Sequence, residues 1–136
     1  MKTILMIIAV VRKDDKVLLR KADPRKNPYK EPWALFGGRI EGDGEVQDLL
    51  SHELKQRWNF SVTIREKLWW DEDIKVDHDG EQKRFIYLDA LCALAEGEPK
   101  PANESEELAW VALGDLATYE LNPPTATLFR KLNWVG

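Results

Sequence analysis

The stretch that decides the fold is WALFGGRIEGDGEVQDLLSHELKQRWNF, residues 33–60. It opens with aromatic and aliphatic residues typical of a strand over 33–38. Gly37 and Gly38 then allow a sharp turn that leaves backbone carbonyls and amides uncovered. A helix is predicted over about 44–58, with Asp43 as its N-cap and Glu45 in the first turn, where the helix dipole favours negative charge.

Apolar residues recur at helical spacing through the second half of this stretch. They predict one buried stripe, made of Val46, Leu49, Leu50, Leu54 and Trp58. Four polar or charged residues flank the stripe and are expected to face back toward the glycine turn. These residues are His52, Glu53, Gln56 and Arg57.

This arrangement of strand, glycine turn, acidic loop and helix resembles the Nudix box. The pattern of that family is G-x5-E-x7-R-E-U-x-E-E-x-G-U, where U is a bulky aliphatic residue. Gly38 matches the first glycine, and Glu53 matches the glutamate after the arginine. Leu54 and Phe60 occupy bulky positions, and Glu41 fits the glutamate often seen after the glycine pair. The register needs no gap.

The chain departs from the box at five positions. Gly44 stands at the first glutamate, His52 at the arginine, Gln56 and Arg57 at the paired glutamates, and Asn59 at the last glycine. Arg57 lies four residues after Glu53, so the two side chains can pair on the helix surface. Its positive charge is predicted to weaken a metal site there unless Arg57 turns to a phosphate.

The rest of the chain fits one soluble domain over residues 1–136 of the α/β (α+β) class. Hydrophobic residues make up 43% of the 136 residues, charged residues 32%, and the net charge is −4 without a basic stripe. We therefore expect no nucleic-acid partner. Cys92 lies in an apolar run and is expected to be a buried, inert thiol, which fits a cytoplasmic location.

Further strands are predicted at residues 3–12, 16–21, 61–71, 82–95 and 108–112, with a helical turn at 114–119 and a helix from Pro123 to about Leu132. The N-terminal apolar run suits a buried strand better than a signal peptide, and no stretch is long enough to span a membrane. The segments ESEELAWVALGDL and LNPPTATLFRKL also resemble the Nudix family. The resemblance implies the Nudix fold, a mixed sheet between helices.

The resemblance also implies an activity. Nudix enzymes hydrolyse a nucleoside diphosphate linked to another group with the help of Mg²⁺ or Mn²⁺, so the expected ligand is a nucleotide-type small molecule. The candidate metal ligands are Glu53, the carbonyl of Gly38, Glu41 and Glu45. The candidate catalytic residues are Glu53, His52 and, from an acidic loop where some members place a general base, Glu104. The candidate substrate-binding residues are Arg39, Arg57, Phe36 and Trp70.

Most of these candidates have a purely structural alternative. Glu41 can simply brace the loop, and Glu45 can serve the helix dipole alone. The late-loop glutamates, Glu104 and Glu106 among them, can be solvated. Adjacent Trp69 and Trp70 should point to opposite faces of a strand, one buried and the other lining a cleft or a homodimer contact. A Nudix-fold protein that binds a nucleotide or protein partner without catalysis remains the alternative function, and an unrelated α/β domain is a third.

Overall fold

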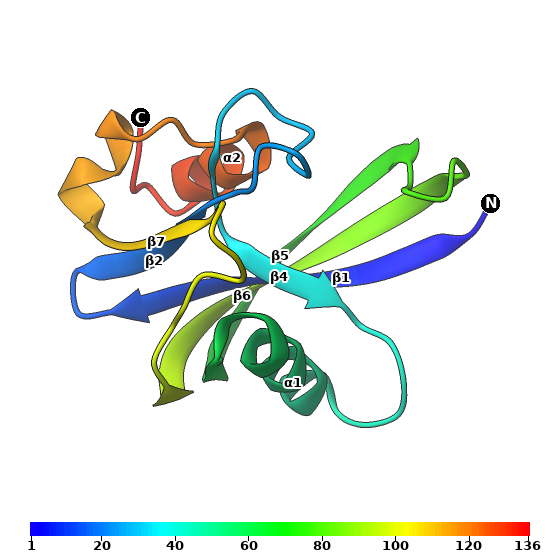
Figure 1. Cartoon of the computed structure of the whole chain (residues 1–136), viewed down its shortest axis with the longest axis horizontal. Coiled ribbons are helices and arrows are strands. Elements are labelled where there is room, and N and C mark those ends of the chain that lie inside the picture. The colour runs from blue at the N-terminus through cyan, green and yellow to red at the C-terminus, as the bar shows by residue number, and fades with distance from the viewer.

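The computed structural model describes residues 1–136 and is built on a seven-stranded mixed sheet (Figure 1). Its strands are β1 (Thr3–Lys13), β2 (Lys16–Lys21), β3 (Trp33–Ala34), β4 (Phe36–Arg39), β5 (Phe60–Val76), β6 (Gln82–Gly97) and β7 (Glu107–Ala112). Its helices are α1 (Val46–Trp58), the 3-10 helix η1 (Leu113–Thr118) and α2 (Pro123–Lys131). The main strand order is β3-β2-β1-β6-β5, while β4 pairs with β1 and β7 with β2.

Strand β1 lies at the centre of the sheet. It runs parallel to β6 from Thr3 to Arg12 and pairs antiparallel with β4 through Met6–Ala9 on its other edge. Val10 and Val11 are both fully buried although they point to opposite faces. Such two-sided burial explains why the N-terminal run is continuously apolar rather than alternating.

The two main helices cover opposite faces of the sheet (Figure 1). Helix α1 packs on one face through Leu50, Leu54 and Trp58. Helix α2 packs on the other face through Leu128 and Phe129. The predicted mixed sheet between helices is therefore confirmed. No helix in the structure has the length and apolar composition needed to cross a bilayer.

The predicted strand over 33–38 is two strands. β3 pairs with β2, β4 pairs with β1, and Leu35 lies between them. At this break the carbonyl of Leu35 accepts a hydrogen bond of 3.0 Å from Arg20 Nε. The break thus exposes a backbone acceptor to a side chain of β2.

The helix start was predicted too early. Gly44 has a φ of +123°, which a helix does not allow, so α1 begins at Val46. Glu45 is the N-cap, and its side chain makes no capping hydrogen bond. The assignments of Asp43 to the cap and Glu45 to the first turn are therefore wrong. Val46 is 38% exposed, so it lies outside the buried stripe.

Strand β5 is longer and more irregular than predicted. It reaches Val76 instead of residue 71, and its pairing with β6 shifts register between Lys67 and Trp70. Trp69 and Trp70 are 41% and 64% exposed, so the expectation that one of them is buried is wrong. The register shift breaks the strict alternation on which that expectation depended.

Asp89 on β6 is a buried carboxyl group. It is 5% exposed, and its Oδ2 has no hydrogen-bond partner. Burial, followed by a hydrogen bond to Asp71 and the charge of Asp71, raises the pKa of Asp89 to about 7. Lys131 lies 2.8 Å from Asp71 and moderates the effect.

We predict that stability falls between about pH 4 and pH 7. Folded Asp89 keeps its proton up to about pH 7, whereas an unfolded aspartate loses it near 3.8, so the folded state binds more protons in this window. Asp89→Asn should flatten the decline and stabilise the protein at pH 8 by on the order of 2 kcal/mol. Urea unfolding across pH measures this, with the exposed-loop variant Asp43→Asn as control. Equal slopes for Asp89→Asn and the wild type would contradict it.

Strand β4 and helix α1 approach each other most closely at Gly38. A Cβ atom added there would lie 2.5 Å from Glu53 Cγ and 3.3 Å from Glu53 Cβ. Because Cβ and Cγ of Glu53 are close to the backbone of helix α1, these atoms cannot move far from position 38. Only glycine therefore fits at position 38 while Glu53 keeps its place.

Gly38→Ala should lower the free energy of unfolding by about 1–3 kcal/mol, the usual cost of overpacking. Gly114→Ala is the matched control, because a Cβ at Gly114 meets nothing within 4 Å. The contact also predicts rescue: in a Glu53→Ala background, Gly38→Ala should cost much less. An equal cost in both backgrounds, measured by urea unfolding, would show that Glu53 is not the obstacle.

Candidate functional site

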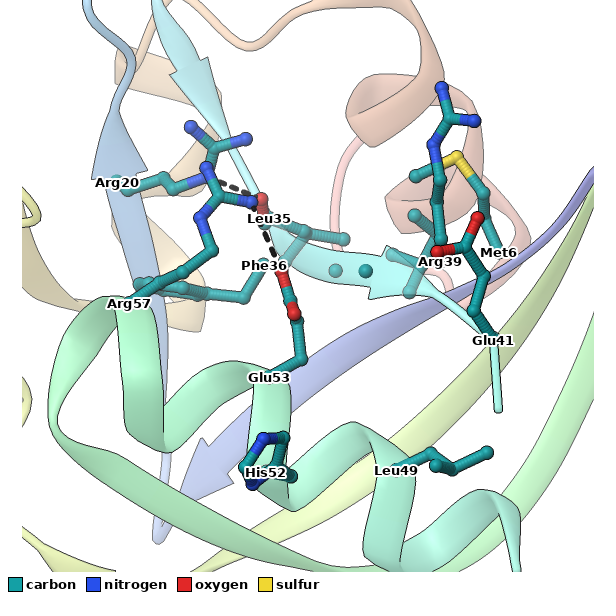
Figure 2. Close-up of a pocket in the computed structure, with 13 residues that line it drawn as sticks. Met6, Arg20, Leu35, Phe36, Arg39, Glu41, Leu49, His52, Glu53 and Arg57 are labelled. Carbon is teal, nitrogen blue, oxygen red and sulfur yellow. Dashed lines mark hydrogen bonds and ion pairs between the residues drawn. The ribbon is translucent and has the colours of Figure 1, made fainter. Parts of the chain in front are cut away.

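A cavity of about 470 Å³ lies between β4 and α1 (Figure 2). Its walls come from β1, β2, the β3–β4 break, β4, the loop after it, and one side of α1. The lining residues are Met6, Ile8, Arg20, Leu35, Phe36, Gly37, Gly38, Arg39, Glu41, Leu49, His52, Glu53 and Arg57. Of the four helix residues expected to face the glycine turn, His52, Glu53 and Arg57 line the cavity, whereas Gln56 is exposed and does not.

Glu53 is the carboxylate at the centre of the helix wall. Its side chain lies over Gly38 and is 33% exposed. Its nearest charged partner is Arg57, one helical turn later, with Nη1 3.7 Å from Oε1. The predicted pairing of these two residues is therefore present, although this distance is too long for a hydrogen bond.

Two guanidinium groups lie against the same indole at one end of the cavity. Arg57 Cζ is 4.2 Å from the centroid of the Trp58 ring, and Arg20 Cζ is 5.3 Å from it. Trp58 itself is 1% exposed. Cation–π attraction and burial thus place both arginines beside one rigid surface.

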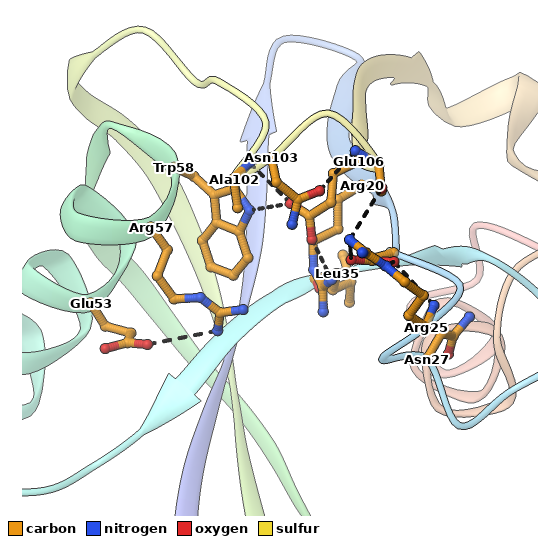
Figure 3. A network of polar contacts seen from close by, with 12 residues as sticks. Arg20, Arg25, Asn27, Leu35, Glu53, Arg57, Trp58, Ala102, Asn103 and Glu106 are labelled. Atoms are coloured by element: carbon orange, nitrogen blue, oxygen red, sulfur yellow. Dashed lines mark hydrogen bonds and ion pairs between the residues drawn. The ribbon is translucent and has the colours of Figure 1, made fainter.

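Glu106 fixes the Trp58 indole by a hydrogen bond (Figure 3). Its side chain is 5% exposed, and Oε1 accepts hydrogen bonds from Trp58 Nε1 at 2.9 Å and from the amide of Ala102 at 3.1 Å. Oε2 lies 3.5 Å from Arg20 Nη1. Burial lowers the pKa of Arg20, and the charge of Glu106 opposes this. The expectation that the late-loop glutamates are solvated is wrong for Glu106.

Arg39 lines the opposite end of the cavity but is already engaged. Its guanidinium lies 2.7 Å from Asp77 Oδ1 in the β5–β6 turn. Asp77 also accepts a hydrogen bond from Lys83 Nζ at 2.9 Å, and these partners lower the pKa of Asp77. Arg39 therefore ties β4 to the β5–β6 hairpin, and its charge is compensated.

Of the remaining predicted residues that line the cavity, His52 and Glu41 are exposed to it. Figure 2 shows Glu41 near Met6 and Arg39, away from Arg57. Phe36 belongs to the core: it is fully buried, and its ring packs edge-to-face on Trp58 at 4.9 Å and on Phe60 at 5.3 Å. A buried ring offers no surface to a substrate, so the interpretation of Phe36 as a binding residue is corrected.

Three predicted residues lie outside the cavity. Glu45 is the exposed helix N-cap, Glu104 is exposed in the late loop, and Trp70 is on the exposed half of β5. The sequence analysis instead missed Arg20, which sits at the end of β2 without any motif around it. Only the fold, which places Arg20 opposite the β3–β4 break, brings this residue to the cavity.

The residues present do not form a metal site by themselves. No group of three or more His, Cys, Asp or Glu side chains in the structure could hold a metal ion. The helix side that faces β4 offers one carboxylate, Glu53, and its neighbour is the cation Arg57. Divalent ions of the magnesium type need several oxygen ligands, so this side-chain set does not fit an ion held by the protein alone.

Comparison with known proteins identifies the family to which this fold belongs. Residues 2–132 match the family model described as the NUDIX domain. The chain is 28% identical over 137 residues to the protein named nucleoside triphosphatase NudI from Escherichia coli O139:H28, covering 92% of this chain and 93% of the relative.

Two solved structures share the fold. A NUDIX hydrolase from Nitrosomonas europaea superposes with a TM-score of 0.73 at 15% identity, covering 97% of this chain and 89% of the other. The NUDIX domain of Shewanella oneidensis NrtR, complexed with ADP ribose, gives 0.67 at 17% identity, covering 98% and 88%. With a family match that spans nearly its whole length, the chain belongs to the Nudix family.

Proposed function

We propose that this protein hydrolyses a phosphoanhydride bond in a nucleoside diphosphate linked to another group, with an altered and weakened metal site. The observation that carries the proposal is the placement of Glu53 over Gly38, in a cavity that also presents arginine side chains. A nucleoside triphosphate belongs to this substrate class, since it is a nucleoside diphosphate linked to a phosphoryl group. The relative named nucleoside triphosphatase supports that choice.

The reaction places particular demands on the cavity. Water attacks a phosphorus atom, the bond to the bridging oxygen breaks, and negative charge builds up on the phosphoryl oxygens. Cationic groups aimed at those oxygens stabilise the transition state. Arg57 can supply such a group, because guanidinium geometry suits phosphate. His52 is exposed to the cavity and can accept the proton of the attacking water.

The metal requirement is the altered part of the proposal. Mg²⁺ is commonly bound through one or two carboxylates plus the phosphates of the substrate, rather than by a complete protein cage. Glu53 is the carboxylate beside Gly38 that would bind such an ion together with the phosphates of the substrate. We therefore expect a divalent ion to bind weakly to the free protein and to bind together with the nucleotide.

Glu53→Gln should lower kcat/KM for nucleotide hydrolysis by about 100-fold or more, because it removes the carboxylate proposed to bind the divalent ion with the nucleotide. The assay measures phosphate or pyrophosphate release from a panel of nucleoside triphosphates and nucleoside diphosphate conjugates with Mg²⁺. Glu104→Gln is the matched control and should keep wild-type activity, since Glu104 is exposed outside the cavity. Turnover by Glu53→Gln equal to that of the wild type would refute the assigned role.

A Mn²⁺ titration followed by water proton relaxation tests the metal part separately. Without nucleotide we expect no specific enhancement at submillimolar Mn²⁺. With a nucleoside diphosphate present, a protein-dependent enhancement should appear and should be lost in Glu53→Gln. Tight Mn²⁺ binding to the free wild-type protein would contradict the weakened site.

A further inference from the structure

Two arginines, Arg20 and Arg57, lie together at the end of the cavity near Trp58. Three arginines line the cavity as a whole, against two glutamates. Arg39 is paired with Asp77 at 2.7 Å, whereas the ion pairs of Arg20 with Glu106 and of Arg57 with Glu53 are longer, at 3.5 Å and 3.7 Å. The two longest of these ion pairs therefore belong to Arg20 and Arg57, which makes them the cations that an anion in the cavity can engage most readily.

Packing on one indole brings these two cations together, since their carboxylate partners, Glu106 and Glu53, are different residues. Both guanidinium groups lie within 5.3 Å of the Trp58 ring centroid. The indole cannot move away, because it is buried and its Nε1 donates to Glu106. The positive charge of Arg57 also acts unfavourably on the charged form of Arg20. An anion bound to both groups would relieve this repulsion.

Arg20 is fixed, while Arg57 is free to turn. Arg20 Nε donates to the Leu35 carbonyl at 3.0 Å, and its side chain is 22% exposed. Arg57 is 46% exposed, and its ion pair with Glu53 is long and solvated, so it holds the side chain weakly. Figures 2 and 3 show both guanidinium groups beside the Leu35 region of the β3–β4 break.

We propose that Arg20 and Arg57, stacked on Trp58, form a binding site for the diphosphate group of the substrate that works without a metal ion. The site rests on the proposed function, since it identifies where the phosphates of that substrate bind. Arg57 can donate two parallel hydrogen bonds to phosphoryl oxygens, and Arg20, whose Nε and Nη1 already donate to Leu35 and Glu106, can donate through Nη2. When Arg57 turns to the phosphate, the Glu53 carboxylate loses its cation and becomes available to the reaction.

Metal-free binding of inorganic pyrophosphate tests this site directly. Calorimetric titration in excess EDTA at low ionic strength should show binding to the wild-type protein. Arg57→Gln should weaken the affinity by about tenfold, the loss expected for one charge-assisted contact. The matched control is Arg12→Gln, which removes another arginine stacked on a tryptophan, 5.5 Å from the Trp134 centroid and outside the cavity. It should bind pyrophosphate as the wild type does.

Arg20 needs a more conservative variant because its side chain is partly buried. Arg20→Lys keeps the charge but removes the fork-shaped donor set, so it should also weaken pyrophosphate binding while thermal unfolding confirms that it folds. Absence of pyrophosphate binding to the wild type in EDTA would overturn the site. Equal affinity of Arg57→Gln and the wild type would do the same.

The outcomes separate this site from the proposed hydrolysis. Nucleotide hydrolysis with Mg²⁺ but no metal-free pyrophosphate binding would leave the hydrolase and remove the arginine site. Pyrophosphate binding that depends on Arg57, with no turnover of any nucleotide in the panel, would leave the arginine site and remove the hydrolase.

Discussion

Helix α1 can lie close to β4 only because residue 38 has no side chain. The atoms of Glu53 occupy the space that a Cβ at Gly38 would need. This contact fixes the height of the helix above the strand, and with it the width of the cavity. It also fixes the rotation of the helix: once Glu53 points at Gly38, Leu50 and Leu54 face the core, and Arg57 lies beside the cavity one turn later.

The opposite wall depends on the β3–β4 break and on Glu106. Leu35 leaves a carbonyl free for Arg20, and Glu106 holds the indole on which Arg20 and Arg57 lie. A buried carboxylate is costly unless it is fully hydrogen-bonded, and Glu106 meets that condition with a backbone amide, an indole and an arginine. Three segments far apart in the sequence therefore cooperate to hold two cations at one end of the cavity.

The local pattern of the sequence predicted most elements because hydrophobic periodicity reports burial directly. The stripe Leu50, Leu54 and Trp58 and the two-sided burial of β1 follow from it. The misses have a different origin. The helix start depended on the backbone angle at Gly44, and the exposure of Trp69 and Trp70 depended on a register shift against another strand. Arg20 and Glu106 were not assigned because contacts between distant segments leave no local signal.

The change from glutamate to arginine at position 57 reverses the charge next to Glu53, and this has consequences for how phosphate charge is neutralised. A glutamate there would repel the substrate unless a divalent ion intervened, whereas Arg57 attracts it directly. The same arginine opposes a metal ion only while it faces Glu53, and a bound phosphate offers it a better partner than a carboxylate 3.7 Å away. In the binding mode that we propose, phosphate binding and the release of Glu53 are one event, so the charges of the site would assemble only with the nucleotide present. The arginine is then compatible with hydrolysis rather than a sign that catalysis is lost.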